Sequence, residues 1–465
     1  MTRSTTWDRA LVLGSGFAGL LAARVLTGYF RHVTLLEQDV SPGVQVRPGV
    51  PHAHHPHALL ARGAAELEEL FPGIRAELLA RGCPVADFAQ TTRVLFPTGW
   101  APRTPVGVEV QLMARTVLEQ AVRERVARLE NVTVRDGLRV ERLLLDVDRD
   151  VTGVLARPRR PGRVPGEDPG EVRLLADLVV DATGRASRLP RWLADAGHHV
   201  PDSLEVDARA SYSSRLYTLP FDPDRDWNAS YQPTMAPTSP RGAVAVRIAP
   251  ALWLLGLIGT AGHTPPDDED GFRAYAAGLR NPDFLRLIDE GEPAGAIHRT
   301  HATVNRWHRY HRVRTWPDRL VALGDSVCAF NPVYGQGMTV AALQAELLDT
   351  RLARQAATGR LDGLGRAFQR GAAAIVRGPW QLSASTDRAW LDTVLPPSSR
   401  IATGYLTAVT ARLPHRPGLY RRFVRTWQML DGPAALASPG ALAQLISLPS
   451  TARHRERCPC PGAAP

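Results

Sequence analysis

Apolar residues recur along the chain first as short uninterrupted runs and then at helical spacing, and this order predicts strands that lead into helices. The opening residues predict a buried strand over 9–14, a helix over 17–28 and a second strand over 32–36. An amphipathic pattern predicts another helix over 115–129. A compact strand–helix–strand unit of this kind is typical of an α/β fold.

The middle of the chain continues with strand patterns. Strand-like runs are predicted over 132–145, 151–157 and 171–181. The Pro-, Gly- and Arg-rich residues 158–170 are predicted to form an exposed loop before the last run. Further on, the pattern predicts an inserted sheet with a covering helix. Its strand-like runs are 205–219, 241–249 and 251–260, and its helical run is 268–290.

The last third of the chain returns to the opening pattern and then becomes helical. A buried strand is predicted over 319–325 and a helix over 337–356, and the pattern beyond residue 362 is mostly helical. The Arg-, Cys- and Pro-rich residues 452–465 are expected to be disordered. The whole pattern favours an α/β protein with an inserted β-sheet region and a helical C-terminal region.

A glycine-rich motif occupies the turn from the first strand to the first helix, and it reads Gly14-Ser15-Gly16-Phe17-Ala18-Gly19. In such a turn the first glycine permits the tight bend, the second lets the backbone approach a pyrophosphate, and the third lets helix and strand pack closely. The phosphates then bind at the helix N-terminus. Glu37, at the end of the second strand, can accept hydrogen bonds from a ribose. The motif predicts dinucleotide binding but does not separate NAD from FAD.

Two later segments bear on that distinction. The strand over 178–181 ends in an Asp-x-x-Gly turn with Asp181 and Gly184, and the strand from Leu320 leads to Gly324-Asp325 and then to Asn331-Pro332-Val333-Tyr334-Gly335-Gln336-Gly337-Met338-Thr339. A carboxylate at a strand end can accept hydrogen bonds from a ribityl hydroxyl. Glycines let a helix N-terminus approach a planar ring and stabilise negative charge there. Taken singly, each segment can also be a plain strand-to-turn junction.

Together and in this order, the segments resemble the FAD-dependent monooxygenases built like p-hydroxybenzoate hydroxylase, over about residues 5–375. The resemblance implies a Rossmann-like FAD-binding domain, with Asp325 on the ribityl chain and Arg115 as the family's FAD-contacting arginine. The ADP half of FAD would be held by Gly14, Gly16, Gly19 and Glu37. In full, the implied cofactor-binding residues are Gly14, Ser15, Gly16, Phe17, Ala18, Gly19, Glu37, Arg115, Asp181, Gly184, Gly324, Asp325, Pro332, Gly335, Gly337 and Met338.

The resemblance also implies how the chain divides. The FAD-binding domain would be formed by 1–199 and 301–375, a substrate-binding β-sheet domain by 200–300, a helical region by 376–451 and a tail by 452–465. Residues 75–112 would contribute to the substrate pocket. Met113, Tyr212 and Trp253 are candidates for the pocket wall, although each is explained equally well as a core residue.

A finer likeness lies in Pro332-Val333-Tyr334-Gly335-Gln336-Gly337-Met338-Thr339-Val340, which is similar to squalene epoxidases and to the bacterial epoxidases of polyether-forming polyenes. The segment from Gly49 to Gly73 also looks like the polyene epoxidase group. That group usually shows Gln-x-Arg-His-x-His, whereas this chain has His52-Ala53-His54-His55-Pro56-His57. His54 thus stands where the group has an arginine near the flavin, and whether it replaces that arginine in function is open.

The charge of the chain comes from one kind of cation. There are 56 Lys+Arg against 46 Asp+Glu, a formal net charge of +10, and every cation among the 56 is arginine. Chemistry that needs a side-chain amine is therefore excluded. Flavin-dependent halogenases share the fold, but they need a lysine to relay the halogen and carry a Trp-x-Trp-x-Ile-Pro segment that this chain lacks. Halogenation is thus excluded, and the charge is assigned to a solvated arginine surface.

Other chemistry and other locations are disfavoured. The four histidines of the 52–57 loop lack a carboxylate or cysteine at metal-ligand spacing, so no metal is expected. The basic-aromatic stretch 306–314 is interpreted as solvated strand and loop residues rather than a nucleic-acid site. Scattered cysteines, no signal-peptide pattern and no apolar run long enough for a membrane span favour a cytoplasmic protein with no integral membrane segment.

The expected function is that of an FAD-dependent monooxygenase that inserts one oxygen atom from dioxygen through a flavin hydroperoxide. The leading substrate implied by the resemblance is an olefin in a polyketide or terpenoid secondary metabolite, which would be epoxidised. Hydroxylation of a phenolic ring is the alternative, and a flavin-linked reductase ranks below both. The chain has no second GxGxxG, so NAD(P)H would bind transiently or a partner flavin reductase would deliver the electrons. No catalytic residue is assigned, because the cofactor carries the reactive chemistry.

Overall fold

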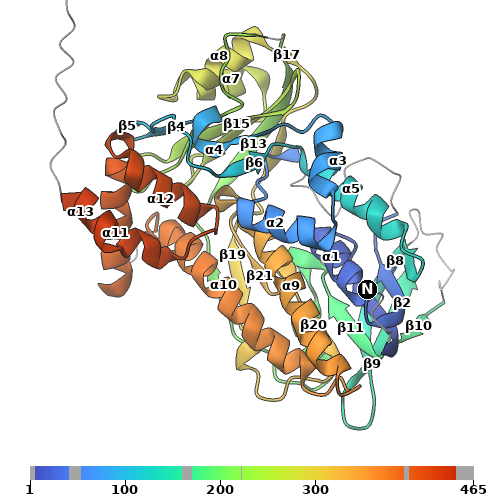
Figure 1. Ribbon diagram of the computed structural model, residues 1–465. Coiled ribbons are helices and arrows are strands. Elements are labelled where there is room, and N and C mark those ends of the chain that lie inside the picture. Colours follow the sequence, from blue (N-terminus) through green and yellow to red (C-terminus); the bar gives the residue numbers. More distant parts are fainter. Residues whose placement is uncertain (1–5, 41–53, 160–169, 221, 392–396, 447–465) are drawn as a thin grey trace, which may run out of the picture.

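A parallel sheet forms the first layer of the protein. The computed structural model describes residues 6–40, 54–159, 170–220, 222–391 and 397–446 (Figure 1). In spatial order the five strands of this sheet are β20 (Leu320–Ala322), β11 (Leu178–Asp181), β1 (Trp7–Leu13), β2 (Phe30–Leu36) and β7 (Val132–Arg135). All four strand pairs run parallel. The α/β fold with a parallel sheet is confirmed.

Alternation along β1 separates the two faces of this sheet. Ala10 and Val12 pack into one hydrophobic core and Leu11 and Leu13 into another. The first core is shared with helices, namely α1 (Phe17–Leu26), α5 (Arg115–Ala127), α9 (Gly337–Ala356) and α10 (Leu364–Arg388). The second is shared with an antiparallel three-stranded sheet, β8 (Leu138–Leu145), β9 (Val151–Pro158) and β10 (Val172–Leu175). Both faces of the parallel sheet are therefore covered.

A larger sheet of eight strands stands at the other end of the molecule (Figure 1). Its strands are β17 (Glu292–Pro293), β13 (Ser211–Thr218), β16 (Leu252–Gly259), β15 (Arg241–Ala249), β14 (Ala229–Gln232), β4 (Thr92–Phe96) and β5 (Gly99–Trp100) in spatial order, with β18 (His298–Thr300) beside β13. Helices α7 (Glu269–Ala277) and α8 (Asp283–Glu290) share a hydrophobic core with it. Strand β4 comes from the first hundred residues and pairs in parallel with β14.

Short elements and the C-terminal helices complete the fold. The short elements are α2 (Ala61–Leu70), α3 (Ile74–Ala80), α4 (Phe88–Thr91), α6 (Leu189–Asp195), the β3 (Val85–Asp87) and β6 (Glu109–Gln111) pair, and the sheet of β12 (Ser203–Val206), β19 (Asn305–His308) and β21 (Cys328–Ala329). Helices α11 (Pro397–Arg412), α12 (Pro417–Trp427) and α13 (Pro439–Ile446) lie beside β4 and β5 (Figure 1). The predicted helical C-terminal region is confirmed.

Several predicted elements are interrupted in the structure. The helical run 268–290 is two helices: α7 ends with Gly278 as its C-cap, and Pro282, which has no N–H to donate within a helix, is the N-cap of α8. The runs 132–145, 171–181 and 205–219 are each two strands, and the strand predicted over 319–325 ends at Ala322. In the first of these runs Gly137, with φ +73°, turns the chain between β7 and β8. Most of the predicted 158–170 loop and the whole 452–465 tail lie outside the described residues.

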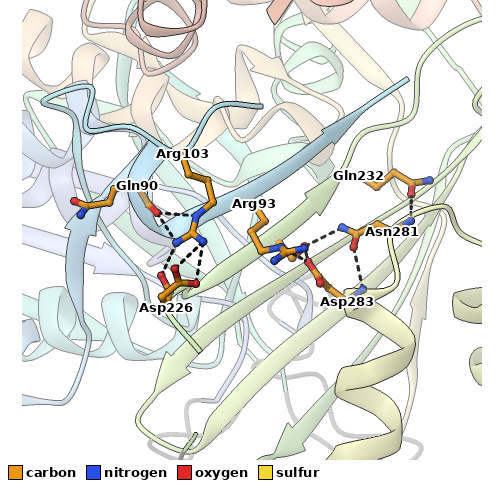
Figure 2. A network of polar contacts seen from close by, with 8 residues as sticks. Gln90, Arg93, Arg103, Asp226, Gln232, Asn281 and Asp283 are labelled. Atoms are coloured by element: carbon orange, nitrogen blue, oxygen red, sulfur yellow. Dashed lines mark hydrogen bonds and ion pairs between the residues drawn. The ribbon is translucent and has the colours of Figure 1, made fainter. Parts of the chain in front are cut away.

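A polar network ties β4 to the rest of the eight-stranded sheet (Figure 2). Arg93 Nε lies 2.9 Å from Asp283 Oδ2, and the same oxygen accepts a hydrogen bond of 2.6 Å from Ser230 Oγ. Asn281 donates to Ser230 Oγ at 2.8 Å and, through its backbone N–H, to Gln232 Oε1 at 2.9 Å. Asp283 is almost completely buried, and the network supplies partners for the Oδ2 atom of its carboxylate away from water.

A second arginine closes the same edge of the sheet. The Arg103 guanidinium donates to the Asp226 carboxylate at 2.9 Å and to the backbone oxygen of Gln90 at 2.9 and 3.1 Å (Figure 2). Arg103 also donates to the backbone oxygen of Asp226 at 2.7 Å. These contacts connect the segment after β5 with the segment before β14.

Candidate cofactor site

A cavity of about 600 Å³ opens at the carboxyl ends of the parallel strands. Leu13 ends β1, Leu36 ends β2, and Ala182 and Gly324 follow β11 and β20; all four residues line it. In open α/β sheets this edge is where ligands bind. Of the residues predicted to bind cofactor, the cavity brings together Gly14, Gly16, Phe17, Ala18, Glu37, Arg115, Gly184, Gly324, Asp325, Pro332, Gly335, Gly337 and Met338.

The glycine turn before α1 forms one end of this cavity. Gly14 has φ +93°, and a Cβ there would lie 2.6 Å from the Ala182 oxygen. A Cβ on Gly19 would lie 1.9 Å from the Gly14 oxygen, so α1 can approach β1 only because both residues are glycines. At Gly16 a Cβ would meet no atom of the described residues within 4 Å, and none of their side chains caps the helix that begins there. The N–H groups of α1 are thus open to the cavity.

Glu37 lies beside this turn and is held by it. Its Oε2 atom accepts hydrogen bonds from Ser15 N at 3.0 Å and Ser15 Oγ at 2.8 Å, and its Oε1 atom accepts from Asp39 N at 3.1 Å. Arg123 donates to the Ser15 backbone oxygen at 2.7 Å. Ser15 and Gly19 do not line the cavity; they shape its wall from behind. Sequence reasoning missed Arg123, whose position on α5 carries no motif.

The Asp325 carboxylate faces the cavity from the turn after β20. Among the residues that the structure describes, no hydrogen-bond donor is paired with this carboxylate. Burial raises the pKa of Asp325, and the guanidinium groups of Arg185 and Arg115 oppose that rise. A partly buried carboxylate without a protein donor is suited to accept hydrogen bonds from a ligand hydroxyl.

The N-terminus of α9 forms the other side of the cavity. Gly335 has φ +66° and turns the chain into the helix, and no side chain in the described part of the chain caps α9 at Gln336. The Asp325 Oδ1 atom lies 3.5 Å from where a Cβ on Gly337 would be, so the helix begins next to that carboxylate. Two uncapped helix N-termini, those of α1 and α9, therefore meet at one cavity, and both favour negative charge.

Asp181 lies behind the wall rather than in it. Its side chain is fully buried and accepts hydrogen bonds from Thr183 N at 3.0 Å, Thr183 Oγ1 at 2.6 Å and Ser187 Oγ at 2.6 Å. Burial raises the pKa of Asp181, and these hydrogen bonds oppose that rise. Asp181 thus fixes the turn that carries Gly184, which has φ +78° and lines the cavity.

The three candidates for a substrate pocket lie elsewhere. Trp253 is buried in the core of the eight-stranded sheet, with its ring 5.2 Å from that of Trp227. Met113 packs against the helical side of the parallel sheet. Tyr212 is buried, and its hydroxyl donates to Asn331 Oδ1 at 2.7 Å. None of the three lines the cavity. Trp253 lies in a hydrophobic core, and Met113 packs against another.

Cationic side chains line the cavity, and they include the predicted Arg115 and further arginines that were not predicted. Arg115 pairs with Glu119 at 2.7 Å and approaches His57 Nε2 at 3.3 Å. Arg185 donates to the backbone oxygens of Val304 and Phe330, each at 2.6 Å. The sequence carried a signal for Arg185, because it follows Gly184 in the Asp-x-x-Gly turn. His57 lies in the loop that resembles the polyene epoxidase segment, but it was not predicted to bind cofactor. Arg139, Arg188 and Arg306 complete the cationic lining.

The histidine loop is described from His54 onward. His54 does not line the cavity; its ring stacks on His298 of β18 at 3.6 Å between centroids. His55 Nδ1 lies 2.8 Å from Ser214 Oγ, and burial, followed by the neighbouring His54 and His298, lowers the pKa of His55 to about 4. In the described part of the chain, no three His, Cys, Asp or Glu residues are grouped as a metal site.

The basic-aromatic stretch 306–314 is less solvated than predicted. Trp307 and Tyr310 are buried in the core on the second face of the parallel sheet, which corrects their assignment to solvated positions. Arg306 pairs with Glu205 and Arg309 with Asp202, each at 2.6 Å. The hydrophobic effect favours burial of the aromatic rings, whereas Arg306 and Arg309 keep their guanidinium groups partly exposed. No helix in the described ranges has the length and apolar character that a membrane span requires.

Solved structures show which class of protein has this fold. The flavin-dependent brominase Bmp2 aligns with a TM-score of 0.63 and 15% identity, over 91% of this chain and 93% of that chain. PqsL from Pseudomonas aeruginosa, described as a probable FAD-dependent monooxygenase, aligns with a TM-score of 0.58 and 17% identity, over 89% and 98%. The fold is that of FAD-dependent monooxygenases and halogenases.

Sequence comparison places the chain in a family. It is 34% identical over 392 residues to Protein Rv3254 of Mycobacterium tuberculosis (strain ATCC 25618 / H37Rv), over 82% of this chain and 80% of that protein, and it belongs to the same family. It is 25% identical over 368 residues to kynurenine 3-monooxygenase of Salinispora tropica, over 74% of this chain and 72% of that enzyme. No family model matches the chain.

Proposed function

We propose that this protein is an FAD-dependent monooxygenase that transfers one oxygen atom from dioxygen to a small-molecule substrate. The observation that carries the proposal is the Asp325 carboxylate, which faces a cavity between two uncapped helix N-termini without a donor from the described residues. The glycine turn at Gly14–Gly19 supplies the backbone approach that a pyrophosphate needs. The residues present therefore fit FAD.

Each part of the cavity has a task in holding the cofactor. Gly14, Gly16 and the N-terminus of α1 would bind the pyrophosphate, and Glu37 the ribose. Asp325 would accept hydrogen bonds from the ribityl chain, and the segment 332–338 with the N-terminus of α9 would lie at the flavin ring. When bound and reduced, FAD supplies the dioxygen chemistry. The protein supplies position, exclusion of water and the positive end of α9 for negative charge on the ring.

The substrate class is proposed from resemblance. The likeness of Pro332–Val340 to squalene epoxidases and polyene epoxidases supports epoxidation of an olefin in a polyketide or terpenoid. The kynurenine 3-monooxygenase relative is a specific observation in favour of aromatic ring hydroxylation as the second candidate. Halogenation is not proposed, because the printed sequence contains no lysine to relay a halogen. NAD(P)H, used directly or through a flavin reductase, would reduce the flavin.

Reconstitution with FAD tests the cofactor. Purified protein should bind FAD tightly and turn yellow, as absorbance and fluorescence titration would show. Asp325→Ala should weaken binding by about tenfold or more, because the ribityl hydroxyl loses its acceptor. The control Asp148→Ala removes an exposed carboxylate in the turn between β8 and β9 and should bind FAD as the wild type does. A wild type that binds no FAD would overturn the proposal.

Labelled dioxygen tests the reaction. With NAD(P)H, a flavin reductase and ¹⁸O₂, one labelled atom should enter an alkene probe, as mass spectrometry would show. Label on the ring of a phenolic probe instead would establish the second candidate. In a parallel assay without the added reductase, consumption of NAD(P)H by the FAD-loaded protein with no label in either probe would make the protein a flavin-linked reductase and refute oxygen transfer.

A further inference from the structure

A buried carboxylate on α10 lies directly behind the turn that lines the cavity before α9. Asp387 is 1% exposed, and it accepts hydrogen bonds from three side chains. Its Oδ1 atom accepts from Tyr334 Oη at 2.6 Å, and its Oδ2 atom accepts from Asn331 Nδ2 at 3.0 Å and Asn305 Nδ2 at 2.5 Å. Asn331 lines the cavity, and Tyr334 lies between the lining residues Pro332 and Gly335.

The backbone determines the direction of these hydrogen bonds. The Val333 N–H can only donate, and its acceptor is Asn331 Oδ1 at 3.2 Å, so the amide nitrogen of Asn331 must face Asp387. Likewise the Asn331 N–H donates to Asn305 Oδ1 at 2.8 Å, so the amide nitrogen of Asn305 also faces Asp387. Asp387 Oδ2 is therefore met by two amide donors, and no other side-chain type of this size accepts as many hydrogen bonds.

Further contacts fix the same turn. The Tyr212 hydroxyl donates to Asn331 Oδ1 at 2.7 Å, and Ser383 Oγ hydrogen-bonds to Asn305 Oδ1. Trp427 of α12 donates to the Tyr334 backbone oxygen at 3.5 Å. Burial raises the pKa of Asp387, and the hydrogen bonds from Tyr334, Asn331 and Asn305 oppose that rise. The network is fully paired, which makes it stiff and specific in geometry.

We infer that Asp387 is a positioning residue, whose buried carboxylate holds the Asn331–Gly335 turn in the place where the flavin ring binds. The inference rests on the proposed function and goes beyond it, since it gives the C-terminal helices a role in shaping the cofactor site. Asp387 does not line the cavity and acts through Asn331 and Tyr334. Loss of its carboxylate would take an acceptor from Asn305, Asn331 and Tyr334 and release the turn.

Paired substitutions separate geometry from simple stability. In Asp387→Asn the side-chain oxygen can still accept from both amides, and its nitrogen can donate to the Tyr334 hydroxyl oxygen, so the turn should keep its shape. In Asp387→Leu all three donors lose their acceptor. Tyr334→Phe removes one donor only and provides a milder variant in case Asp387→Leu does not fold. Thr386→Val is the control, because among the described residues the Thr386 hydroxyl bonds only to the Leu382 oxygen within α10.

The measurement is the dissociation constant for FAD, together with the absorption spectrum of the bound flavin. Asp387→Leu should weaken binding by about 100-fold and Tyr334→Phe by about tenfold, each with an altered spectrum. Asp387→Asn should stay within about threefold of the wild type, and Thr386→Val should match it. Wild-type affinity and spectrum in Tyr334→Phe and Asp387→Leu would overturn the inference. A wild type without FAD binding would overturn the proposed function, and this inference with it.

Discussion

The two large sheets of this protein carry buried polar groups of opposite kinds. At the edge of the parallel sheet, the Asp325 carboxylate and two uncapped helix N-termini face a cavity without protein partners among the described residues. In the eight-stranded sheet, Asp283 pairs with Arg93 and Ser230 (Figure 2). Polar groups paired with one another stabilise the fold, whereas groups that wait for a partner mark a ligand site. Substitutions should therefore affect stability in one region and cofactor binding in the other.

The largest effect is expected at Gly14, because this residue contributes both to the stability of the fold and to the cofactor cavity. Gly14→Val should lower the free energy of unfolding by about 3 kcal/mol, because φ +93° is strained for valine and its Cβ would lie 2.6 Å from the Ala182 oxygen. FAD binding should fall by about 100-fold or more. Denaturant unfolding and flavin titration measure the two losses. Gly107→Val is the matched control, since Gly107 also has positive φ, +70°, but lies away from the cavity.

Arg93→Met should affect stability alone. It leaves Asp283 buried with one partner fewer, and the free energy of unfolding should fall by about 2 kcal/mol, less than for a fully buried pair because Arg93 is partly exposed. The folded variant should bind FAD within about twofold of the wild type, because the network lies outside the cavity. A large loss of FAD affinity at unchanged stability would refute the contrast between the two sheets.

Asp325→Asn should show the reverse behaviour. FAD affinity should fall by about tenfold, because an amide accepts a hydroxyl hydrogen bond less strongly than a carboxylate does. The variant without FAD should be at least as stable as the wild type, because the carboxylate is costly to bury. Destabilisation of the flavin-free variant would show that Asp325 is a structural residue.

The pH dependence of that stability difference sharpens the same point. Because the folded-state pKa of Asp325 is raised, stability contributed by its protonation is present below its ordinary value of 3.8 and is lost as pH rises through the raised value. The advantage of Asp325→Asn over the wild type should therefore grow with pH from 3.8 upward and then level off. Unfolding curves of both flavin-free proteins across this range measure it, and a difference independent of pH would contradict the burial argument.

The smallest effect is expected from Ser15→Ala. The substitution removes the hydrogen bond from Ser15 Oγ to Glu37 but keeps the bond from the Ser15 backbone N–H. The free energy of unfolding should fall by about 1 kcal/mol, and FAD affinity by about threefold as Glu37 becomes less well oriented. A flavin titration measures the loss of FAD affinity, and an unfolding curve measures the loss of stability. Unchanged FAD affinity would mean that the Ser15 hydroxyl does not orient Glu37 for cofactor binding.

Local pattern accounts for the elements that hold the cofactor site. The β1–α1–β2 opening and helix α9 follow from contiguous apolar spacing and from glycines whose backbone roles are local. The break within 268–290 could also be predicted from the sequence, because Gly278 and Pro282 both disfavour one continuous helix. The positions of Met113 and Trp253 could not be predicted, since an apolar residue suits a core and a pocket wall equally. Asp387 could not be found either, because its partners Asn305, Asn331 and Tyr334 lie more than fifty residues away in sequence.

The parallel pairing of β4 with β14 limits which fragments of the protein can be expressed alone or exchanged with a relative. Thr92, Arg93 and Val94 pair with Ala229, Ser230 and Tyr231, so the eight-stranded sheet is built from two stretches of chain, and strands β7 and β11 of the parallel sheet lie between them in sequence. A fragment of residues 200–300 would leave β14 as a raw edge open to other chains and Asp283 without Arg93. Transplanting this sheet into a relative therefore requires moving both stretches together, and a contiguous swap should yield an aggregating chimera.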